Sequence, residues 1–359
     1  MPRVVIAAGG TAGHVVPAMA VAAELQAAGA EVSFIGTRDR AEAKLVPAAG
    51  FEIDYLNVSG LDRRNPLKAA AAAARAAASL PAARRVLRRR DADVVLGGGG
   101  YVAGPAGLAA VGLRLPLVLT EADSHLGLAN RMLAGRARRV CLAFPIPGRD
   151  GDPYLVTGRP VPAAVLNADR DEARRRFGID SGARCLAVVG GSQGAHSVNE
   201  AALAAFGGTE QDFWVLHVAG RRDYPELRGR LAEGTPRYVL LEYEPNLGDV
   251  LAASDLVLGR AGGSIFEFTA AGVPALLVPY PHATGDHQAA NAAWMQRAGA
   301  AVVIDDAELD PARLREQVAE VLGDAAELER MASASRSLAM PDAAARIAQE
   351  VLAAVGGPR

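Results

Sequence analysis

The chain opens with MPRVVIAAGGTAGHVVPAMAVAAEL (residues 1–25), a stretch that predicts a strand, a glycine-rich turn and a helix. Val4 to Ala8 form an apolar run, glycines follow, and apolar residues then recur at helical spacing. Backbone N–H groups of such a turn can approach a phosphate at the positive end of the helix. The spacing G-G-x-x-G-H matches neither the dinucleotide fingerprint nor the P-loop. His14 ends the turn, and it either serves chemistry at an anion site or only caps or packs against the turn.

Three further apolar runs end in glycines and lead into helical patterns. With the first they are VVIAAGG (4–10), DVVLGGGG (93–100), LAVVGGSQG (186–194) and DLVLGRAGG (255–263). Strand-like runs alternate with Ala/Leu-rich helical runs along the chain, which is typical of α/β proteins with parallel sheets. We therefore predict two doubly wound domains in tandem, divided near VTGRPVP (156–162). If the domains face each other across a cleft, all four loops line it, although any single loop could be only a tight turn.

The composition is that of a globular protein large enough for two domains. The 359 residues are 50% hydrophobic and 22% charged. Cys141 and Cys185 both lie in apolar runs, which favours buried free thiols over a disulfide or a metal site and suggests a reducing compartment. The chain shows no signal-peptide pattern and no long apolar run that would span a membrane, so we expect a cytoplasmic protein.

The net charge of −2 hides an asymmetry between the halves. Residues 1–160 hold 20 Lys and Arg against 13 Asp and Glu, and the rest of the chain holds 18 against 27. Such a basic half can mark a nucleic-acid or an anionic-membrane partner. Aromatic residues are only 5% of the chain and do not interleave with the cations, so we expect a membrane surface and no nucleic acid. The densest cations, which could also be solvated helix faces, are Arg63, Arg64, Lys68, Arg75, Arg84, Arg85, Arg88, Arg89 and Arg90.

The stretch GRAGGSIFEFTAAGVPALLVPYPHATGDHQAANA (259–292) sets polar groups in an apolar frame. Amides at the start of a helix near 262–264 can hold a diphosphate, and Glu267 can accept hydrogen bonds from both hydroxyls of a ribose. Alternatively to a sugar-binding role, Asp286 caps the next helix and Asn291 bonds nearby backbone. No HExxH or paired-Cys pattern occurs, and DGD (150–152) reads as a turn, so no metal site is expected. The residues that could bind sugar hydroxyls are His282, Asp286, His287, Gln288 and Asn291.

Together these motifs resemble those of the MurG family of bacterial glycosyltransferases. The resemblance runs from residue 4 to the last helix and rests on GGTAGH, GGGGYVAGP, GGSQGA, RAGGS with Glu267, and PYPHATGDHQAANA. It implies the GT-B fold, in which two Rossmann-like domains face each other across a cleft. It also implies an inverting, metal-independent hexosyltransferase without a cofactor. Such an enzyme transfers N-acetylglucosamine from UDP-N-acetylglucosamine to lipid I, and so forms lipid II for peptidoglycan at the cytoplasmic face of the cell membrane.

The resemblance also implies roles for the two domains and for single residues. Domain 1–158 would bind the acceptor and face the membrane, domain 159–340 would bind the UDP-sugar, and a last helix at about 341–355 would return to the first domain. His14 is expected to take the proton of the attacking hydroxyl, because a pKa of about 6.5 suits a general base. Glu121 is the second catalytic candidate. Expected acceptor contacts are Gly10, His14, Gly99, Gly100, Tyr101 and Asp123. Expected donor contacts are Thr11, Gly13, Arg159, Ser192, Gln193, Tyr243, Arg260, Gly263, Ser264, Glu267, His287 and Gln288.

The chain departs from the family pattern at four places. GGTAGH carries Ala12 where the family has a glycine, and the family's HEQN reads TEAD (120–123), which keeps the glutamate but lacks the amides. In VTGRPVP, Arg159 stands where the family has Asn and Pro162 where it has Arg, so a phosphate- or uracil-contacting cation has either moved or been lost. The RAGGSIFE loop (260–267) is one residue shorter than the family's RAGASTIAE.

Two other functions stay open at this point. A UDP-N-acetylglucosamine 2-epimerase on the same fold would need neither a lipid acceptor nor a membrane face. A nucleotide-sugar-binding membrane adaptor without catalysis is compatible with the altered TEAD and RPVP segments. Turnover of UDP-N-acetylglucosamine with and without a lipid-diphosphate acceptor would separate these functions from the glycosyltransferase.

Overall fold

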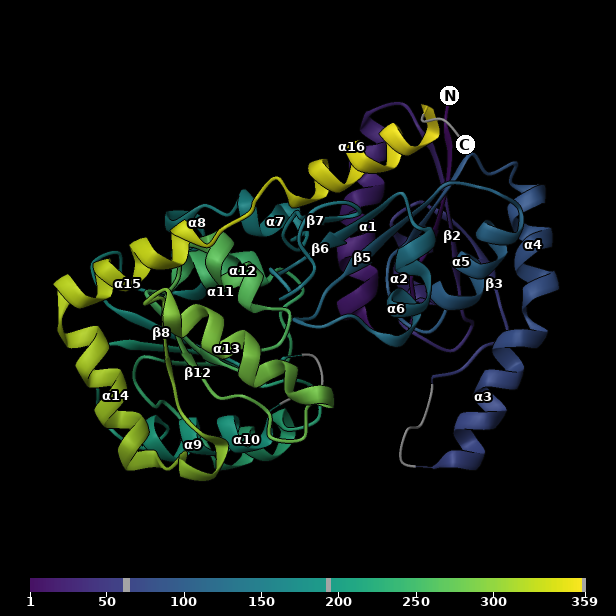
Figure 1. The fold of residues 1–359 in the computed structure, drawn as a ribbon. Helices are drawn as coiled ribbons and strands as arrows, with labels where there is room; N and C mark the ends of the chain where they lie inside the picture. Colours follow the sequence, from purple (N-terminus) through teal and green to yellow (C-terminus); the bar gives the residue numbers. More distant parts are fainter. Residues whose placement is uncertain (61–64, 192–194, 357–359) are drawn as a thin grey trace. The chain divides into compact units, whose positions relative to one another are not determined.

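The computed structural model describes residues 1–60, 65–191 and 195–356. Its internal contacts divide the chain into a first unit, Met1–Pro162 with Met340–Arg359, and a second unit, Ala163–Ala339 (Figure 1). We expected the division after residue 158, and the contacts place it four residues later, after the second proline of VTGRPVP. Each unit contains one parallel sheet with its own helices, so the predicted α/β class with two Rossmann-like domains is confirmed.

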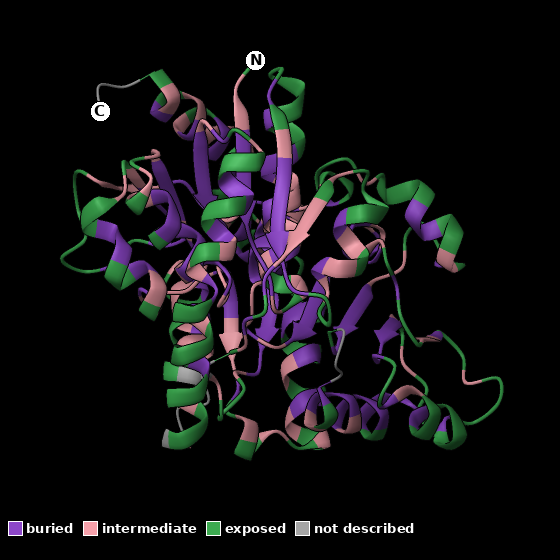
Figure 2. Cartoon of the chain, turned by 90° about the vertical axis from the view of Figure 1, so that its right-hand side faces the viewer, coloured by how far each residue is buried: buried purple, intermediate pink, exposed green. Residues whose placement is uncertain are grey.

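The first unit contains a seven-stranded sheet in the order β3-β2-β1-β4-β5-β6-β7. Strands β1 and β4 are almost wholly buried, as expected for a parallel sheet covered on both faces. Figure 2 shows buried strands in the interior and helices with exposed residues outside them. From β1 the chain proceeds to one side through β2 and β3 and then returns to place β4 on the other side of β1. The strands are β1 (Arg3–Ala7), β2 (Glu31–Gly36), β3 (Glu52–Tyr55), β4 (Val94–Gly97), β5 (Leu117–Glu121), β6 (Arg139–Leu142) and β7 (Tyr154–Val156).

Alternate residues of β1 contribute to two hydrophobic cores, one on each face of this sheet. Val4 and Ile6 pack with residues of α1 and α16, whereas Val5 and Ala7 share a core with residues of α4 and α5. The last helix therefore belongs to the first unit and lies along α1 (Figure 1). The helices are α1 (Ala12–Ala27), α2 (Glu42–Ala48), α3 (Pro66–Ala78), α4 (Leu80–Arg89), α5 (Ala103–Gly112), α6 (Leu128–Leu133), the 3₁₀ turn η1 (Ala134–Arg136) and α16 (Ala343–Gly356).

The second unit repeats this design with a six-stranded parallel sheet in the order β10-β9-β8-β11-β12-β13. Leu186 and Val188 of the central strand pack into one large core with α9, α14 and α15. The strands are β8 (Cys185–Val189), β9 (Trp214–Val218), β10 (Tyr238–Leu241), β11 (Leu256–Gly259), β12 (Ala275–Leu277) and β13 (Ala301–Val303). The helices are α7 (Ala163–Leu166), α8 (Arg170–Phe177), α9 (His196–Phe206), α10 (Tyr224–Arg230), α11 (Leu247–Ala253), α12 (Ile265–Ala271), η2 (Thr284–Asp286), α13 (His287–Arg297), η3 (Asp306–Glu308), α14 (Pro311–Gly323) and α15 (Ala325–Ser337).

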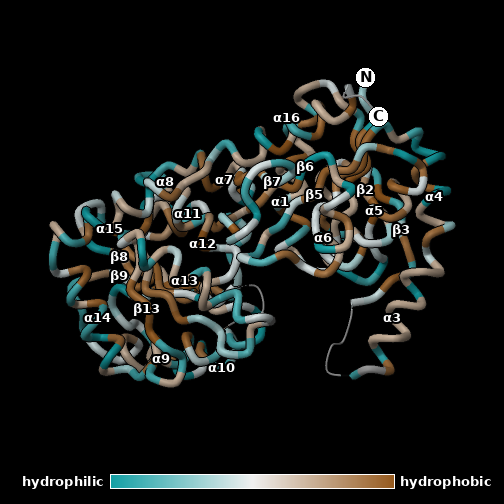
Figure 3. Tube along the Cα trace, viewed as in Figure 1, coloured by the Kyte–Doolittle hydropathy of each residue, from teal (hydrophilic) through white to brown (hydrophobic). Residues whose placement is uncertain are grey.

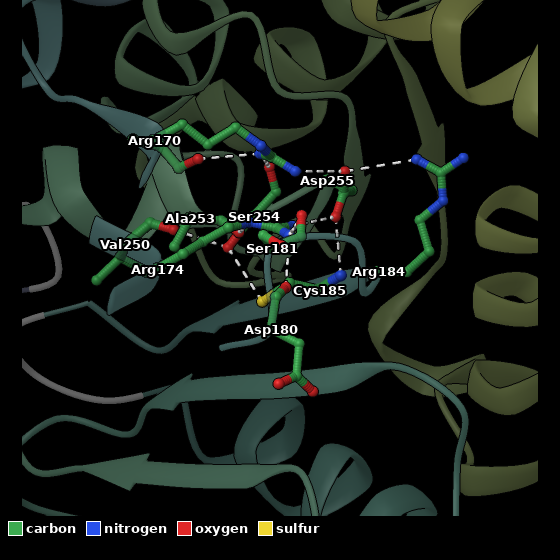
Figure 4. A network of polar contacts seen from close by, with 11 residues as sticks. Arg170, Arg174, Asp180, Ser181, Arg184, Cys185, Val250, Ala253, Ser254 and Asp255 are labelled. Carbon is green, nitrogen blue, oxygen red and sulfur yellow. Dashed lines mark hydrogen bonds and ion pairs between the residues drawn. The ribbon is translucent and has the colours of Figure 1, made fainter. Parts of the chain in front are cut away.

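An ionic network centred on the pair of Arg174 and Asp255 ties the helices of the second unit to the amino ends of its central strands (Figure 4). Asp255, just before β11, accepts hydrogen bonds from Arg174 at 3.0 Å, from Arg170 at 2.8 Å and from the backbone N–H of Cys185 at 2.8 Å. The remaining donors of Arg174 reach carbonyl oxygens of Ala253 and of the turn before β8. The buried Arg174 and the largely buried Asp255 are thus fully hydrogen-bonded, which is what makes a buried ion pair tolerable. It stabilises the end of the sheet opposite the glycine loops.

Both cysteines are buried free thiols, as predicted. Burial raises the pKa of the Cys141 thiol to about 12 and that of the Cys185 thiol to about 11, so neither is a reactive thiolate at neutral pH. Within the described residues, no helix combines the length and apolar character required to cross a membrane.

Candidate active site

Each sheet reverses its strand order between two glycine-terminated strands. The pair is β1 and β4 in the first unit, and β8 and β11 in the second unit. In doubly wound sheets, ligands bind outside the carboxyl ends of the strands at such a reversal. The four glycine-terminated strands therefore end at the edges where sheets of this kind bind ligands, one pair in each unit.

In the first unit the two glycine loops touch through their backbones. Gly100 has a φ of +75°, and a Cβ there would overlap the carbonyl oxygen of Gly9. A Cβ at Gly99, which has a φ of +96°, would lie 2.7 Å from Nδ1 of His14. Only glycine combines this conformation with so close an approach. The loop after β4 is thereby brought against both the loop after β1 and the His14 ring.

His14 lies in the first turn of α1, but it does not cap this helix. The N-cap residue is Thr11, with an extended backbone at φ −134° and without a side-chain capping bond. The alternative of a capping role for His14 therefore finds no support. His14 instead lines a pocket of the first unit at the carboxyl ends of the strands, together with Gly13, Gly98, Thr120, Glu121, Cys141 and Arg159.

The surroundings of His14 keep its imidazole neutral at neutral pH. Burial lowers the pKa of His14 most strongly, and the nearby charge of Arg159 lowers it further. The carboxylates of Asp123 and Glu42 act in the opposite direction. The net shift is downward, so the ring can accept a proton at physiological pH.

Glu121 lines the same pocket, but its carboxylate is occupied by the loop that follows β5. It accepts hydrogen bonds from the backbone N–H of Gly127 at 2.8 Å, from Nδ2 of Asn130 at 2.8 Å and from the backbone N–H of Asp123 at 3.2 Å. Burial raises the pKa of Glu121, and these hydrogen bonds oppose the increase. The geometry therefore suits Glu121 to holding the 122–127 loop in shape.

Two further residues predicted for the site, Arg159 and Tyr101, contact its glycines. Arg159 donates a hydrogen bond from Nη2 to the carbonyl oxygen of Gly13, which holds the guanidinium beside His14. The ring of Tyr101 lies against Gly10, since a Cβ at that glycine would be 3.0 Å from Cε1 of Tyr101. Five of the residues expected in the acceptor site belong to loops at this edge of the sheet, and His14 lies in the first turn of α1. The five are Gly10, Gly99, Gly100, Tyr101 and Asp123.

In the second unit, the loop after β11 leads into α12 and brings Glu267 into the first turn of that helix. Gly263 and Ser264 lie in the loop, and the backbone N–H of Glu267 donates to the carbonyl oxygen of Ser264 at 2.9 Å. Gly272 ends the helix in a left-handed conformation with φ +70°, as is usual for a C-terminal glycine.

Arg260 makes contacts within the second unit that the sequence did not predict. Its Nη1 donates to Oδ1 of Asp306 at 2.6 Å and to the carbonyl oxygen of Val278 at 3.1 Å, and its Nη2 donates to Oγ of Ser197 at 2.7 Å. Its guanidinium also lies 5.4 Å from the centre of the Tyr280 ring. These contacts fix the start of the loop against the neighbouring segments.

The start of α13 lies beside this loop. A Cβ at Gly262 would lie 3.9 Å from Nε2 of Gln288, and Oε1 of Gln288 accepts from the backbone N–H of Tyr280. Asn291 donates to the carbonyl oxygen of Ala261 at 3.0 Å, so its alternative backbone-bonding role is confirmed. Asp286 has a φ of +55° and makes no capping bond, so the alternative that it caps α13 is wrong. His287 is the first residue of α13.

Tyr243, two residues after β10, is 44% exposed and lies under Arg221. The guanidinium carbon of Arg221 is 4.6 Å from the centre of the Tyr243 ring. Arg221 was not predicted, although its position just beyond β9, the neighbour of β10, could have suggested it. Ser192 and Gln193 lie outside the described residues.

Sequence reasoning missed two residues behind these loops. Glu42, at the start of α2, is fully buried and accepts a hydrogen bond from the backbone N–H of Gly10. Arg176 of α8 pairs with Glu244, the residue after Tyr243, and with Asp249. Nothing in the sequence distinguishes either side chain from ordinary surface charges. Among the residues that the structure describes, no three His, Cys, Asp or Glu side chains are grouped so that they could hold a metal ion.

Family descriptions match both halves of the chain. Residues 4–142 match the glycosyltransferase family 28 N-terminal domain, and residues 185–347 match the glycosyltransferase family 28 C-terminal domain. The two matches leave out the linking segment around VTGRPVP, where the first unit gives way to the second.

Full-length relatives are also similar. A protein of Moorella thermoacetica, named UDP-N-acetylglucosamine–N-acetylmuramyl-(pentapeptide) pyrophosphoryl-undecaprenol N-acetylglucosamine transferase, is 43% identical over 98% of this chain and 99% of its own. The crystal structure of Acinetobacter baumannii MurG superposes with a TM-score of 0.79 at 28% identity, over 98% of this chain and all of that one. A UDP-GlcNAc 2-epimerase from Neisseria meningitidis shares the fold, with a TM-score of 0.68 over 98% of this chain and all of that one, but only 15% identity. The chain therefore belongs to glycosyltransferase family 28 and, within it, to the MurG family.

Proposed function

We propose that this protein transfers N-acetylglucosamine from UDP-N-acetylglucosamine to undecaprenyl-diphospho-N-acetylmuramoyl-pentapeptide, lipid I, and thereby forms lipid II in peptidoglycan synthesis. The observation that carries the proposal is a neutral histidine in a pocket formed where two glycine loops meet at the sheet reversal. The printed name of the relative that is 43% identical describes the same transfer. Transfer proceeds without a metal ion and inverts the anomeric carbon.

The acceptor is the proposed ligand of the first unit. The glycine loops around Gly10, Gly99 and Gly100 face its diphosphate, although the N–H of Gly10 itself is bonded to Glu42 behind the loop. Tyr101 and Asp123 lie at the edge of the same site. His14 takes the proton of the attacking sugar hydroxyl as that oxygen forms its bond to the anomeric carbon. The bond from the anomeric carbon to the UDP oxygen breaks in the same step, and UDP leaves with the electron pair.

The donor is the proposed ligand of the second unit. Tyr243 lies against the uracil ring, Glu267 accepts hydrogen bonds from the ribose hydroxyls, and His287 and Gln288 contact the N-acetylglucosamine. Gly263 and Ser264 face the diphosphate, with Ser192 and Gln193 near it, and Arg260 contributes by holding this loop in place. Gly13 and Arg159 line the pocket of His14 in the first unit, and Thr11 is the N-cap residue of α1. A donor phosphate is the proposed ligand of these three residues.

Glu121 is proposed as a positioning residue, because its carboxylate oxygens are engaged by the loop after β5. The same loop carries Asp123, one of the changes from the family's HEQN pattern. Since the carboxylate already accepts three hydrogen bonds, the role of general base falls to His14.

We further propose that the protein works at the cytoplasmic face of the membrane, bound peripherally to anionic lipid. Helices α3 and α4 are the proposed contact. Figure 3 shows α3 in the pale brown of its alanines and α4 with teal arginines between brown residues. Not every arginine of α4 is available, because Arg89 and Arg90 pair with Asp54 of β3. Arg85 and Arg88 are exposed and form no ion pair with any residue that the structure describes.

Turnover of UDP-N-acetylglucosamine with and without lipid I tests the proposal. We expect release of UDP and formation of a disaccharide lipid only when the acceptor is present. Formation of the 2-epimer without acceptor would overturn the proposal in favour of the epimerase. Tight UDP binding with no turnover in either mixture would identify a nucleotide-sugar-binding adaptor instead.

A further inference from the structure

Glu42 is a fully buried carboxylate whose three hydrogen-bond donors are all neutral. Oε1 accepts from the backbone N–H of Thr37 at 2.9 Å and from Oγ1 of the same residue at 2.7 Å. Oε2 accepts from the backbone N–H of Gly10 at 3.0 Å. A buried charge is costly unless its oxygens are hydrogen-bonded. The bonds join two segments that are distant in sequence, the end of β2 and the glycine loop after β1.

The glycine loop is pressed directly onto this carboxylate. A Cβ at Gly9 would lie 2.5 Å from Oε1 of Glu42, so a larger residue there would displace the loop. The other side of the loop meets Gly100 and the ring of Tyr101. Glu42 therefore supports, from behind, a loop whose opposite side forms the proposed acceptor site.

We propose that Glu42 is a positioning residue for the acceptor reaction, which it serves by holding the Gly9–Gly10 loop in the conformation that receives the acceptor diphosphate. This inference rests on the proposed function. Glu42 does not touch the substrate, because it is fully buried behind the loop. It acts through the backbone N–H of Gly10 and through the place of that loop against the loop after β4.

The charge of Glu42 also reaches His14. Its carboxylate raises the pKa of His14, as Asp123 does, whereas burial and Arg159 lower it. Glu121 is the carboxylate that lines the pocket of His14 itself. Removing the charge of Glu42 should therefore lower the pKa of His14 further. This gives a readout that a purely structural role would not move.

The decisive variants are Glu42→Gln and Glu42→Ala, compared with Thr37→Val. Glutamine keeps the shape but offers one acceptor oxygen, so an amide NH₂ must face the backbone N–H of either Gly10 or Thr37. Alanine removes all three hydrogen bonds. Thr37→Val removes only the hydroxyl contact to Oε1 and leaves the bond to Gly10, which makes it the matched control.

Steady-state kinetics with lipid I and UDP-N-acetylglucosamine form the first measurement. We expect Glu42→Ala to lower kcat/KM for the acceptor by about 10- to 100-fold, since small misplacements of a site cost that much. The KM for the donor should change less than about twofold. Glu42→Gln should lower acceptor kcat/KM less and shift the acid limb of its pH profile to lower pH. Thr37→Val should leave both quantities at their parent values.

Amide hydrogen exchange of the peptide containing Gly10 is the second measurement, and it does not depend on activity. We expect faster exchange in both Glu42 variants and unchanged exchange in Thr37→Val. If Glu42→Ala does not fold, Glu42→Gln decides. Parent-like acceptor kinetics or parent-like exchange in a folded Glu42 variant overturns the inference. A parent enzyme that transfers nothing to lipid I overturns the proposed function alone, and the exchange data then decide whether Glu42 holds the loop.

Discussion

At the residue scale, the site depends on where single side chains obtain their hydrogen bonds. His14 and Glu121 line one pocket and both titrate in principle, yet their surroundings separate their roles. The Glu121 carboxylate is surrounded by donors from its own loop, whereas His14 lies against Gly99 and lines the pocket. A base must have an available lone pair, and of the two residues His14 meets this requirement.

The role of His14 is tested by His14→Ala. We expect kcat with lipid I to fall by about 10²–10⁴-fold, the usual contribution of a general base. Affinity for UDP, measured by calorimetry, should stay nearly unchanged, because the donor motifs lie in the second unit. The control is Glu121→Gln, which keeps one acceptor oxygen and should cost less. Near-normal turnover of His14→Ala would reduce His14 to a packing residue.

Arg159 should affect the pH below which the enzyme loses activity because His14 becomes protonated. Its charge lowers the pKa of His14, so Arg159→Met should raise that pKa and move the acid limb of kcat/KM to higher pH. Arg159→Lys keeps the charge and should retain most of the parent profile. The measurement is kcat/KM for the acceptor from pH 5 to 8. An acid limb at the parent position in Arg159→Met would mean that His14 does not control it.

His217 makes the stability of the second unit depend on pH. The ring is fully buried between the hydroxyl of Tyr238 at 2.8 Å and Oδ1 of Asn199 at 3.0 Å. Burial lowers its pKa to about 3. The unfolded chain binds a proton here below about pH 6.5 while the folded chain does not, so stability falls as the pH drops from 6.5 towards 3.

We therefore expect His217→Gln to flatten the stability profile. Between pH 6.5 and 5, its free energy of unfolding should fall less steeply than the parent's, by about 1 kcal/mol per pH unit. Both tryptophans of the chain, Trp214 and Trp294, lie in the second unit, so urea unfolding followed by fluorescence reports this unit. His196→Gln, at a largely exposed position, is the control. If the free energy of unfolding changes equally with pH in the parent and in His217→Gln, His217 is not the source of the pH dependence.

At the scale of elements, α4 shows how ion pairing limits what a basic helix can do. Its buried residues Val86 and Leu87 face the core of the first unit, and its arginines divide into two groups. Arg89 and Arg90 hold the helix to β3, so reversing their charge would damage the fold. Arg85 and Arg88 are exposed and can approach a membrane without breaking an ion pair in the described part of the chain. Arg84 is exposed as well, but its guanidinium packs against Gly112.

The membrane contact is tested by the double variant Arg85→Glu/Arg88→Glu. Each cation near an anionic bilayer contributes about 1 kcal/mol. The variant should therefore co-sediment with phosphatidylglycerol vesicles at least about tenfold more weakly at low salt. UDP affinity should be unchanged. The control reverses two exposed arginines of the second unit, Arg175 and Arg228, and so makes the same change in net charge. Equal co-sedimentation of the two double variants would exclude α4 as the docking face.

At the scale of the whole molecule, the sequence predicted the architecture better than it predicted the residues that hold the loops of the site in place. The four glycine-terminated strands were recognisable because a buried parallel strand is a continuous apolar run and a tight exit needs glycine. Glu42 was not recognisable and Arg221 was not predicted, since a charged residue in such a position is usually interpreted as a surface residue. Their roles arise from contacts with Gly10 and Tyr243. The partner of Arg260 is Asp306, and no local pattern joins residues so far apart.

Chain connectivity at this scale was predictable in outline, and it leads to a test of how independent the two units are. The last helix, α16, crosses back to the first unit, where Ile347 is 1% exposed and shares a core with α1. Ile304 is 1% exposed in the core of the second unit. An Ile→Ala change at either buried site should cost about 2–5 kcal/mol, and the cost should fall on the unit that contains it.

We expect Ile347→Ala to lower the thermal unfolding temperature of the first unit while the tryptophan fluorescence transition, which reports only the second unit, stays in place. Ile304→Ala should have the opposite effect. It should lower the temperature of the fluorescence transition of the second unit and leave the transition of the first unit, followed by circular dichroism, unchanged. UDP added at saturation should raise only the fluorescence transition, because a ligand stabilises the unit that binds it. If both substitutions and UDP shift a single common transition, the two units unfold together. In that case α16, which follows the second unit in the chain and packs on the first, couples their unfolding.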